Sequence, residues 1–154
     1  MIGINAVGKK GERLANQMFQ YAAVKGIAKN RGYSYVVPPS KFTSNADQWQ
    51  EHQLFMPFRL ETFNPLQIQW LDLKRPELRE RHFHFDEDLF NNCPDWVSLH
   101  GFYQSEKYFL NVRDELLKDF SFIDDIKNPC TEMMEGLNKP IALHVRRTDY
   151  AQYG

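Results

Sequence analysis

The chain has 154 residues, 42% of them hydrophobic and 14% aromatic, which is enough to bury the core of one globular domain. Its 19 basic and 20 acidic side chains give a net charge of -1, which excludes a global field that would attract nucleic acid or an anionic membrane. No apolar run approaches the roughly 18 residues of a membrane span, and no secretory signal pattern opens the sequence. We therefore expect a soluble, cytoplasmic protein with no nucleic-acid partner; peripheral attachment to a membrane is the alternative.

The first predicted elements are a strand over residues 2–7 and a helix over residues 16–31. The strand is short and apolar, and the helix shows apolar side chains at helical spacing. Gly32 is well placed to end this helix. Within it, Ala22 and Gly26 are small enough to let the helix lie close on a sheet.

A second strand is predicted over residues 33–37, where β-branched and aromatic residues end at two prolines, so the chain opens with a parallel βαβ unit. Residues 40–76 show no sustained period, and we expect short helices and irregular segments there. A further strand is predicted over residues 97–101 and a helix over residues 105–120, with Ser105 as its cap. The apolar stripe of that helix consists of Phe109, Val112, Leu116 and Phe120.

The last predicted elements are a polar helix near residues 131–137 and a strand over residues 141–145. Near-continuous apolar residues in this strand are typical of a central parallel strand that is covered on both faces. The alternation of strands and helices predicts an α/β, Rossmann-like fold.

Arg146, Arg147 and Asp149 directly follow that last strand. Ligands of open α/β sheets bind beyond the carboxyl ends of the strands, and paired guanidinium groups suit phosphate oxygens because each donates two parallel hydrogen bonds. The alternative is an exposed ion pair between one arginine and Asp149, which contributes little. The residue types alone support both interpretations equally.

Metal and redox sites are weakly indicated. His82 and His84 precede Asp86 in the stretch HFHFD, and a strand there would place both imidazoles on one side, as a metal site requires. Two ligands and one uncertain third are few, so we favour a half-buried strand. Cys93 and Cys130 lack CxxC spacing, and buried thiols are favoured over a single disulfide.

Three segments, GERLANQMFQYA, SLHGFYQSEKYF and ALHVRRTDY, together resemble the successive motifs of the alpha-1,2-fucosyltransferases. FHFDEDLF and RDELLKDFSF are similar to that family as well, so the likeness covers most of the chain. The resemblance implies the two-domain GT-B type of fold, with Rossmann-like domains facing across a cleft. Residues 1–139 would then be the N-terminal domain, and residues 140–154 the first strand and loop of a donor-binding domain that is largely missing.

The resemblance also implies a function, which is the inverting transfer of fucose from GDP-fucose to a galactose hydroxyl of a glycan, without a metal or another cofactor. The expected partners are GDP-fucose, a galactose-containing acceptor and the missing C-terminal donor domain. We expect weak or no activity from these 154 residues alone. The alternatives are a non-catalytic module that binds a nucleotide sugar or phosphate, and an interaction domain.

The resemblance assigns roles to residues near the end of the chain. Arg146 and Arg147 would bind the pyrophosphate and stabilise the leaving group as negative charge develops on it, with Asp149 beside them as a catalytic candidate. His144 would support donor binding.

In the N-terminal motif, Arg13 and Asn16 match the family and are further candidates for donor binding, although Ala15 stands where the family has a glycine. The alternative for these two residues is that Asn16 caps the helix and Arg13 is solvated.

In the middle motif, Tyr103, Gln104 and Ser105 are the candidates for the acceptor cleft. The alternative for Tyr103 is that its ring fills the core.

Overall fold

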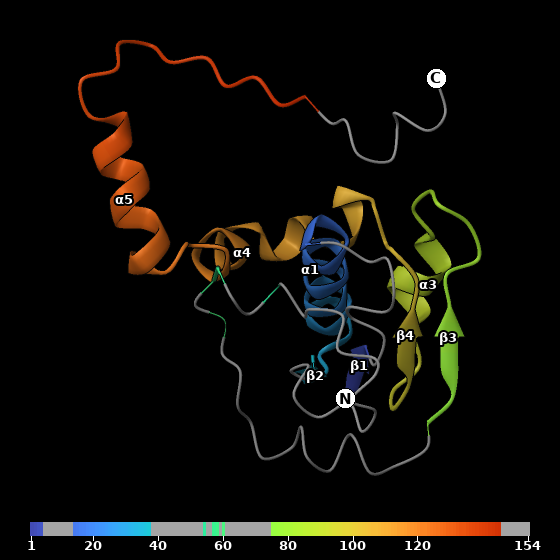
Figure 1. Cartoon of the computed structure of the whole chain (residues 1–154). Helices are drawn as coiled ribbons and strands as arrows, with labels where there is room; N and C mark the ends of the chain where they lie inside the picture. Colours follow the sequence, from blue (N-terminus) through green and yellow to red (C-terminus); the bar gives the residue numbers. More distant parts are fainter. Residues whose placement is uncertain (5–13, 38–53, 55–56, 59, 61–74, 146–154) are drawn as a thin grey trace, which may run out of the picture. The chain divides into compact units, whose positions relative to one another are not determined.

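The computed structural model describes residues 1–4, 14–37, 54, 57, 58, 60 and 75–145 (Figure 1). Contacts between Cα atoms divide the chain into two compact units, Met1–Ile123 and Asp124–Gly154. The sheet and all the buried hydrophobic residues identified in the described part of the chain belong to the first unit. The boundary between two domains at residues 139 and 140 stays a prediction.

A parallel sheet forms the centre of the first unit, with the strand order β2-β1-β4-β3 (Figure 1). Its strands are β1 (Ile2–Ile4), β2 (Tyr35–Val36), β3 (Glu77–Arg79) and β4 (Ser98–His100). Gly3 of the inner strand β1 pairs with Val36 of β2 on one side and with Ser98 of β4 on the other. The sheet confirms the α/β class and the parallel pairing, and it is consistent with a Rossmann-like fold. The strand β3 was not predicted.

Helix α1 (Leu14–Arg31) joins β1 to β2 and covers the sheet. It begins two residues earlier than predicted and ends at Arg31, as predicted. Gly32 follows with φ 68°, the Gly32 amide donates to the carbonyl of Lys29, and the Tyr33 amide donates to the carbonyl of Ala28. These two bonds form a Schellman motif, which explains why a glycine stands at this position.

The predicted helix over residues 105–120 is wrong in its continuity. The structure has two 3-10 turns, η4 (Glu106–Tyr108) and η5 (Leu110–Val112), and then α4 (Arg113–Asp119). Phe109 interrupts the helix with φ -141°, and Ser105 makes no side-chain cap bond.

The interruption has a cause in the packing of α1. A Cβ on Gly26 would lie 2.0 Å from the carbonyl oxygen of Tyr108 and 2.7 Å from the Cα of Phe109. The side chain of Asn111 also donates to the Gly26 carbonyl at 2.9 Å. Gly26 therefore admits the backbone of this segment, whereas the sequence had suggested that it lets the helix approach the sheet. The predicted apolar stripe nevertheless packs into or against the core.

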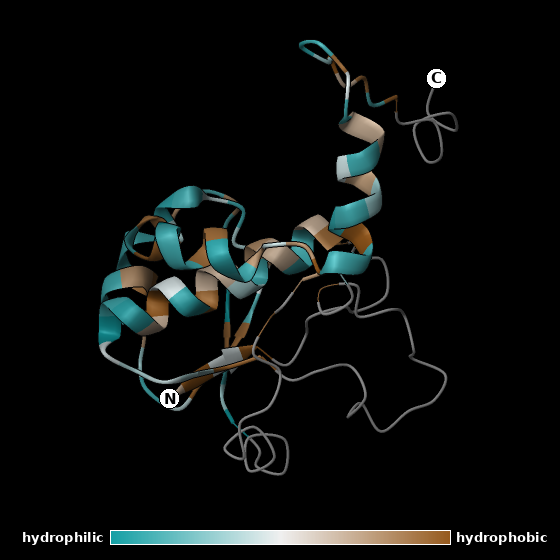
Figure 2. Cartoon of the chain, turned by 90° about the vertical axis from the view of Figure 1, so that its left-hand side faces the viewer, coloured by the Kyte–Doolittle hydropathy of each residue, from teal (hydrophilic) through white to brown (hydrophobic). Residues whose placement is uncertain are grey.

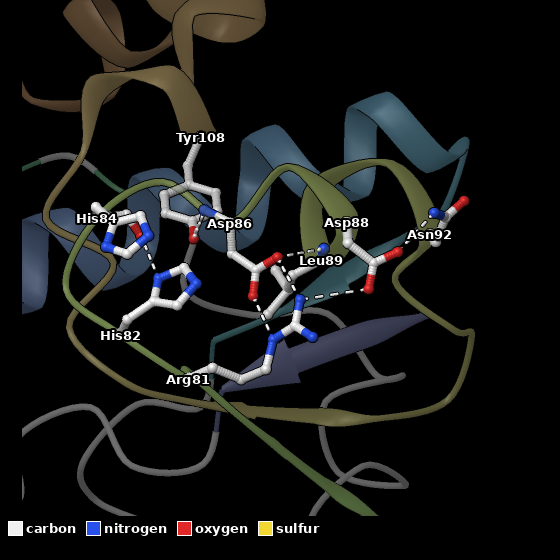
Figure 3. Close-up of polar contacts among 8 residues, drawn as sticks. All are labelled: Arg81, His82, His84, Asp86, Asp88, Leu89, Asn92 and Tyr108. Carbon is white, nitrogen blue, oxygen red and sulfur yellow. Dashed lines mark hydrogen bonds and ion pairs between the residues drawn. The ribbon is translucent and has the colours of Figure 1, made fainter.

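The stretch HFHFD is not a strand, which corrects that prediction. Residues 82–84 form a bend, and the rings of His82 and His84 stack with their centroids 3.5 Å apart (Figure 3). Directly after it, α3 (Glu87–Asn92) begins with Asp86 as its N-cap. Asp86 was thus a helix start signal, because its carboxylate accepts the amide of Leu89 at 3.0 Å.

Apolar side chains from α1, the sheet and the segment after β4 meet in one core. Figure 2 shows brown in parts of the strands, whereas the helices carry both teal and brown turns. The largest fully buried side chains are Ile2, Ile4, Gln17, Gln20, Val24, Ile27, Val36, Leu54, Leu99, Tyr103 and Tyr108. Cys93 lies in this core, and burial raises the pKa of its thiol to about 11. Cys130 is exposed, so only one of the two thiols is buried as predicted, and both are free.

The second unit contains α5 (Asp124–Met134), which begins seven residues before the predicted helix and has Pro129 inside it. The predicted strand over residues 141–145 is wrong for this chain, because these residues form no regular structure and are exposed. A central parallel strand needs hydrogen-bonded neighbours, and none is present among the described residues. None of the helices in the described part of the chain combines the length and apolar composition that a membrane crossing requires.

Candidate functional site at the carboxyl edge of the sheet

Four of the predicted site residues lie outside the described residues, namely Arg13, Arg146, Arg147 and Asp149. His144 is described in the second unit, where it is exposed and belongs to no helix or strand. The donor-binding roles of these residues stay predictions. The described candidates Asn16, Tyr103, Gln104 and Ser105 all belong to the first unit.

These four residues lie near the carboxyl ends of three parallel strands. Gly101 and the residues after it directly follow β4, Glu80 directly follows β3, and Asn16 lies in the first turn of α1, the helix that follows β1. The carboxyl ends of parallel strands meet at one edge of a sheet, where open α/β sheets bind their ligands. The topology therefore places the middle motif and the N-terminal motif together.

A hydrogen bond joins the two motifs directly. The Gln104 Nε2 donates to the Asn16 Oδ1 at 2.8 Å, across 88 positions of sequence. Because α1 begins at Leu14, Asn16 is inside the helix, so the alternative that Asn16 is the N-cap is wrong. Gln104 is exposed and Asn16 is half-buried, which leaves this amide pair accessible from solvent.

The neighbouring glutamines of α1 point inward and fix other segments. Gln17 is fully buried, and its Oε1 accepts the amide of Leu54 at 2.9 Å. The Nε2 of Gln20, which is also buried, donates to the carbonyl of Gly101 at 2.9 Å. Burying an amide side chain is costly unless it is hydrogen-bonded, so these glutamines hold chain segments to the helix.

Residues 101–104 form an irregular segment that opens with a bend at Gly101 and is called the turn below, and the carboxylate of Glu80 binds its backbone. One oxygen of Glu80 accepts the amide of Phe102 at 2.8 Å, and the other accepts the amide of Tyr103 at 3.1 Å. Tyr103 has φ 52°, a left-handed conformation that costs a residue other than glycine roughly 1–2 kcal/mol. Two hydrogen bonds to a charged acceptor contribute on the order of 1.5–3 kcal/mol each and offset this cost.

The ring of Tyr103 fills the core, which confirms the alternative given for this residue in place of a role in the acceptor cleft. The side chain is fully buried, and it meets the ring of Tyr108 edge-on with centroids 5.5 Å apart. Burial raises the pKa of both phenols above the ordinary value. The ring of Tyr103 therefore anchors the turn in the core and is not available to a ligand. Gln104 is exposed and Ser105 is half-buried.

An ion pair between Arg81 and Asp86 is linked to Tyr108, the ring that packs against Tyr103 (Figure 3). Arg81 binds Asp86 through two hydrogen bonds of 2.7 Å, and the amide of Asp86 donates to the hydroxyl of Tyr108 at 2.8 Å. The Arg81 guanidinium, assisted by the amide of Leu89, outweighs the effect of burial and lowers the pKa of the Asp86 carboxyl to about 2. This cluster is structural, because each group is paired within it.

The chemistry available at this edge is hydrogen bonding by neutral amides. Each side-chain amide of Asn16 and Gln104 offers donors and an acceptor, and after their mutual bond both retain unused capacity for the polar groups of a ligand. Among the described residues, no group of three or more His, Cys, Asp or Glu side chains could hold a metal ion. That the reaction needs no metal stays a prediction.

Gln20 and Glu80 were missed by the sequence analysis. Gln20 stands in the quoted N-terminal motif but was treated as part of a helical pattern. Glu80 stands outside every motif, in a segment for which no strand was predicted. The only signal in the sequence would have been a carboxylate placed at the end of a short strand.

Comparison with known proteins identifies the family of the chain. The family model described as glycosyl transferase family 11 matches residues 2–153. The chain is 25% identical to galactoside alpha-(1,2)-fucosyltransferase 2 of Sus scrofa, over 96% of this chain and 41% of that protein. It is 27% identical to galactoside alpha-(1,2)-fucosyltransferase 1 of Bos taurus, over 97% of this chain and 41% of that protein.

A third relative is the galactoside 2-alpha-L-fucosyltransferase SEC1 of Bos taurus, with 26% identity over 97% of this chain and 40% of that protein. The chain thus spans about two fifths of the length of these relatives. No solved structure gives a significant match. Because the family model extends over nearly every residue, from the first strand to the arginine pair, the chain belongs to glycosyl transferase family 11.

Proposed function

We propose that this chain is the N-terminal part of a fucosyltransferase that moves fucose from GDP-fucose to a galactose hydroxyl of a glycan. The proposal is supported by membership of glycosyl transferase family 11 and by relatives named as galactoside alpha-1,2-fucosyltransferases. The observation that carries it is the Asn16–Gln104 hydrogen bond, which joins the N-terminal and middle motifs at the edge where open α/β sheets generally bind ligands.

On this proposal, the amide pair meets the sugars. Asn16 is expected on the donor side and Gln104 on the acceptor side, and the 2.8 Å hydrogen bond between them supports a shared place for these two roles. Amide groups bind sugar hydroxyls as donor and acceptor at once. Such contacts orient the attacking hydroxyl toward the anomeric carbon.

Arg146 and Arg147 serve the leaving group in this mechanism. As the bond between fucose and phosphate breaks, negative charge grows on the β-phosphate, and a fixed guanidinium stabilises that state more than the ground state. Charge-assisted hydrogen bonds contribute about 1.5–3 kcal/mol each, so the pair supplies several powers of ten in rate without a metal ion. The donor domain of the GT-B fold completes the site.

The test is a transfer assay with GDP-fucose and lactose. We expect weak or no turnover from the 154-residue chain, and turnover when a C-terminal donor domain from a family member is fused to it. In that fusion, replacing both Arg146 and Arg147 by Ala should lower kcat/KM by at least about 100-fold, since at least about 3 kcal/mol of transition-state stabilisation is lost. The control is Arg79→Ala, which removes an arginine that is 69% exposed and bonded only to Glu77 among the contacts resolved in the described residues.

Turnover by an active fusion that is unchanged in the double variant would contradict the role of the arginines. A second function is supported by the coverage of only about two fifths of the relatives. In that case the chain is a module that binds a nucleotide sugar without catalysis. GDP binding by calorimetry, with no transfer even in the fusion, would favour this second function.

A further inference from the structure

We propose that Glu80 is the positioning residue of the acceptor site, because its carboxylate fixes the turn that presents Gln104 to Asn16. The inference rests on the proposed function and adds to it a residue outside every family motif quoted above. Glu80 directly follows β3, and its own amide extends the ladder to β4 by donating to the carbonyl of His100 at 2.9 Å. The carboxylate therefore starts from a fixed point on the sheet.

Both oxygens of this carboxylate are used on the backbone of the turn. They accept the consecutive amides of Phe102 and Tyr103, at 2.8 Å and 3.1 Å. Consecutive amides that converge on one anion are typical of a backbone in which one residue is left-handed, as Tyr103 is with φ 52°. Among the described residues no cation is paired with Glu80, so its negative charge is directed at these amides.

Gly101 explains how the carboxylate reaches the turn. A Cβ at this position would lie 2.4 Å from the Cβ of Glu80 and 2.7 Å from its Oε2. The side chain of Glu80 therefore occupies the space that any other residue at position 101 would need. Gln20 of α1 also donates to the Gly101 carbonyl at 2.9 Å, so the turn is bound both by a residue that follows β3 and by a residue of the helix.

The consequence falls on Gln104. It directly follows the left-handed Tyr103, so the direction of its side chain depends on that conformation being kept. Asn16 belongs to a regular helix and does not move with the turn. Without the carboxylate, Tyr103 relaxes toward negative φ, and the amide of Gln104 leaves the 2.8 Å contact with Asn16. Glu80 thus acts on the acceptor through Gln104 and touches no sugar itself.

The test combines lactose binding with amide exchange, both measured by NMR on the full 154-residue chain. In Glu80→Gln, which keeps the size but removes the charge and one acceptor oxygen, we expect the amides of Phe102 and Tyr103 to lose exchange protection. The dissociation constant for lactose should rise about tenfold, which corresponds to about 1.4 kcal/mol. Gln104→Ala should weaken lactose binding similarly while both turn amides stay protected, because there the contact is lost and the turn is kept.

Two further variants make the outcome decisive. In Gly101→Ala the added methyl group should push the Glu80 carboxylate away from the turn. This variant should therefore reproduce the exchange and binding changes of Glu80→Gln. Glu87→Gln is the matched control, since Glu87 is exposed and no described contact joins it to the turn. Exchange of the β1 amides serves as an internal measure of global folding in every variant.

Unchanged lactose affinity in a folded Glu80→Gln variant with unprotected turn amides would overturn the inference and leave the proposed function standing. Turn amides that stay protected in that variant would overturn it as well. If the wild-type chain binds no lactose, the proposed acceptor role of this unit fails first, and the inference fails with it.

Discussion

At the scale of single residues, Asp86 shows how one side chain can serve several segments. Its carboxylate accepts two hydrogen bonds from Arg81 and caps α3 through the amide of Leu89, while its own amide binds Tyr108. The side chain is only 2% exposed, whereas Arg81 is 58% exposed. A buried carboxylate with these partners is ionised in the folded state and stabilises the fold through its charge.

This charge predicts a pH dependence of stability. The folded pKa of Asp86 is about 2, below the ordinary 3.8, so its contribution is complete above about pH 4 and is lost as the pH falls toward 2. The shift corresponds to about 2 kcal/mol, which solvent screening of the exposed Arg81 reduces to about 1–2 kcal/mol. Asp86→Asn keeps a good N-cap but removes the charge, so wild type should exceed the variant by that amount at pH 7 and by almost nothing near pH 2.

Urea unfolding at pH 7, 4, 3 and 2 measures this difference. The control is Asp88→Asn, because Asp88 contacts the same Arg81 at 3.3 Å but is 68% exposed. Its effect should stay within about 0.5 kcal/mol at every pH. A difference between wild type and Asp86→Asn that does not shrink toward pH 2 would show that the charge of Asp86 does not contribute in this way.

At the scale of elements, the packing of α1 against the segment after β4 depends on one glycine. The backbone at Tyr108 and Phe109 approaches Gly26 so closely that no Cβ fits, and α1 is tied to α4 by Lys25. Burial alone would lower the pKa of Lys25, but its hydrogen bond to Asp119 and the nearby Glu115 outweigh this effect and raise the pKa. The helix is therefore fixed by close backbone contact and by charge.

Gly26→Ala should destabilise the fold even though alanine is the better helix former by about 1 kcal/mol. The added methyl group would meet backbone atoms, which cannot move aside as a side chain can, so we expect a net loss of about 3 kcal/mol. Thermal and urea unfolding measure it. In Gly32→Ala nothing lies within 4 Å of the added Cβ, and only the left-handed φ of 68° costs, by about 1 kcal/mol. Equal losses in the two variants would exclude the steric cause.

The sequence was sufficient for the elements whose signal is local. The period of α1, the glycine at its end and the apolar β1 predicted the βαβ unit and its parallel pairing. The interruption at Phe109 was out of reach, because it depends on the approach of Gly26 from 83 positions away. The three residues of β3 are too few for a period, and a strand over residues 141–145 needs neighbours that no local pattern supplies.

The candidate site was predictable only where motifs marked it. Asn16 and Gln104 were named from their motifs, but nothing in the sequence indicated that they bond to each other. The burial of Tyr103 and the role of Glu80 follow from a left-handed turn at a position that is not glycine. Such turns have no reliable signature in a single sequence.

At the scale of the whole molecule, the buried side chains identified in the described residues all belong to Met1–Ile123. In Asp124–Gly154 the described apolar side chains remain largely exposed, including Met133 at 78%, Ile141 at 95% and Leu143 at 87%. The free energy of folding therefore comes mainly from the first unit.

Removal of residues 124–154 should leave a cooperatively folding protein. Because the truncation deletes no buried hydrophobic side chain identified among the described residues, we expect the free energy of unfolding to change by less than about 1 kcal/mol. Circular dichroism during urea titration compares the truncated and full chains, with the slope of the transition as the check on cooperativity. A broad transition, or a midpoint far below that of the full chain, would show that the second unit contributes to the core.

The two cysteines differ in a way that is useful at the bench. Cys93 is enclosed in the core with a thiol that ionises only near pH 11, whereas Cys130 lies exposed on α5. The native chain thus offers a single addressable sulfur for maleimide chemistry, without any engineering. A fluorophore attached there would report on the polarity around α5, because its emission follows its surroundings.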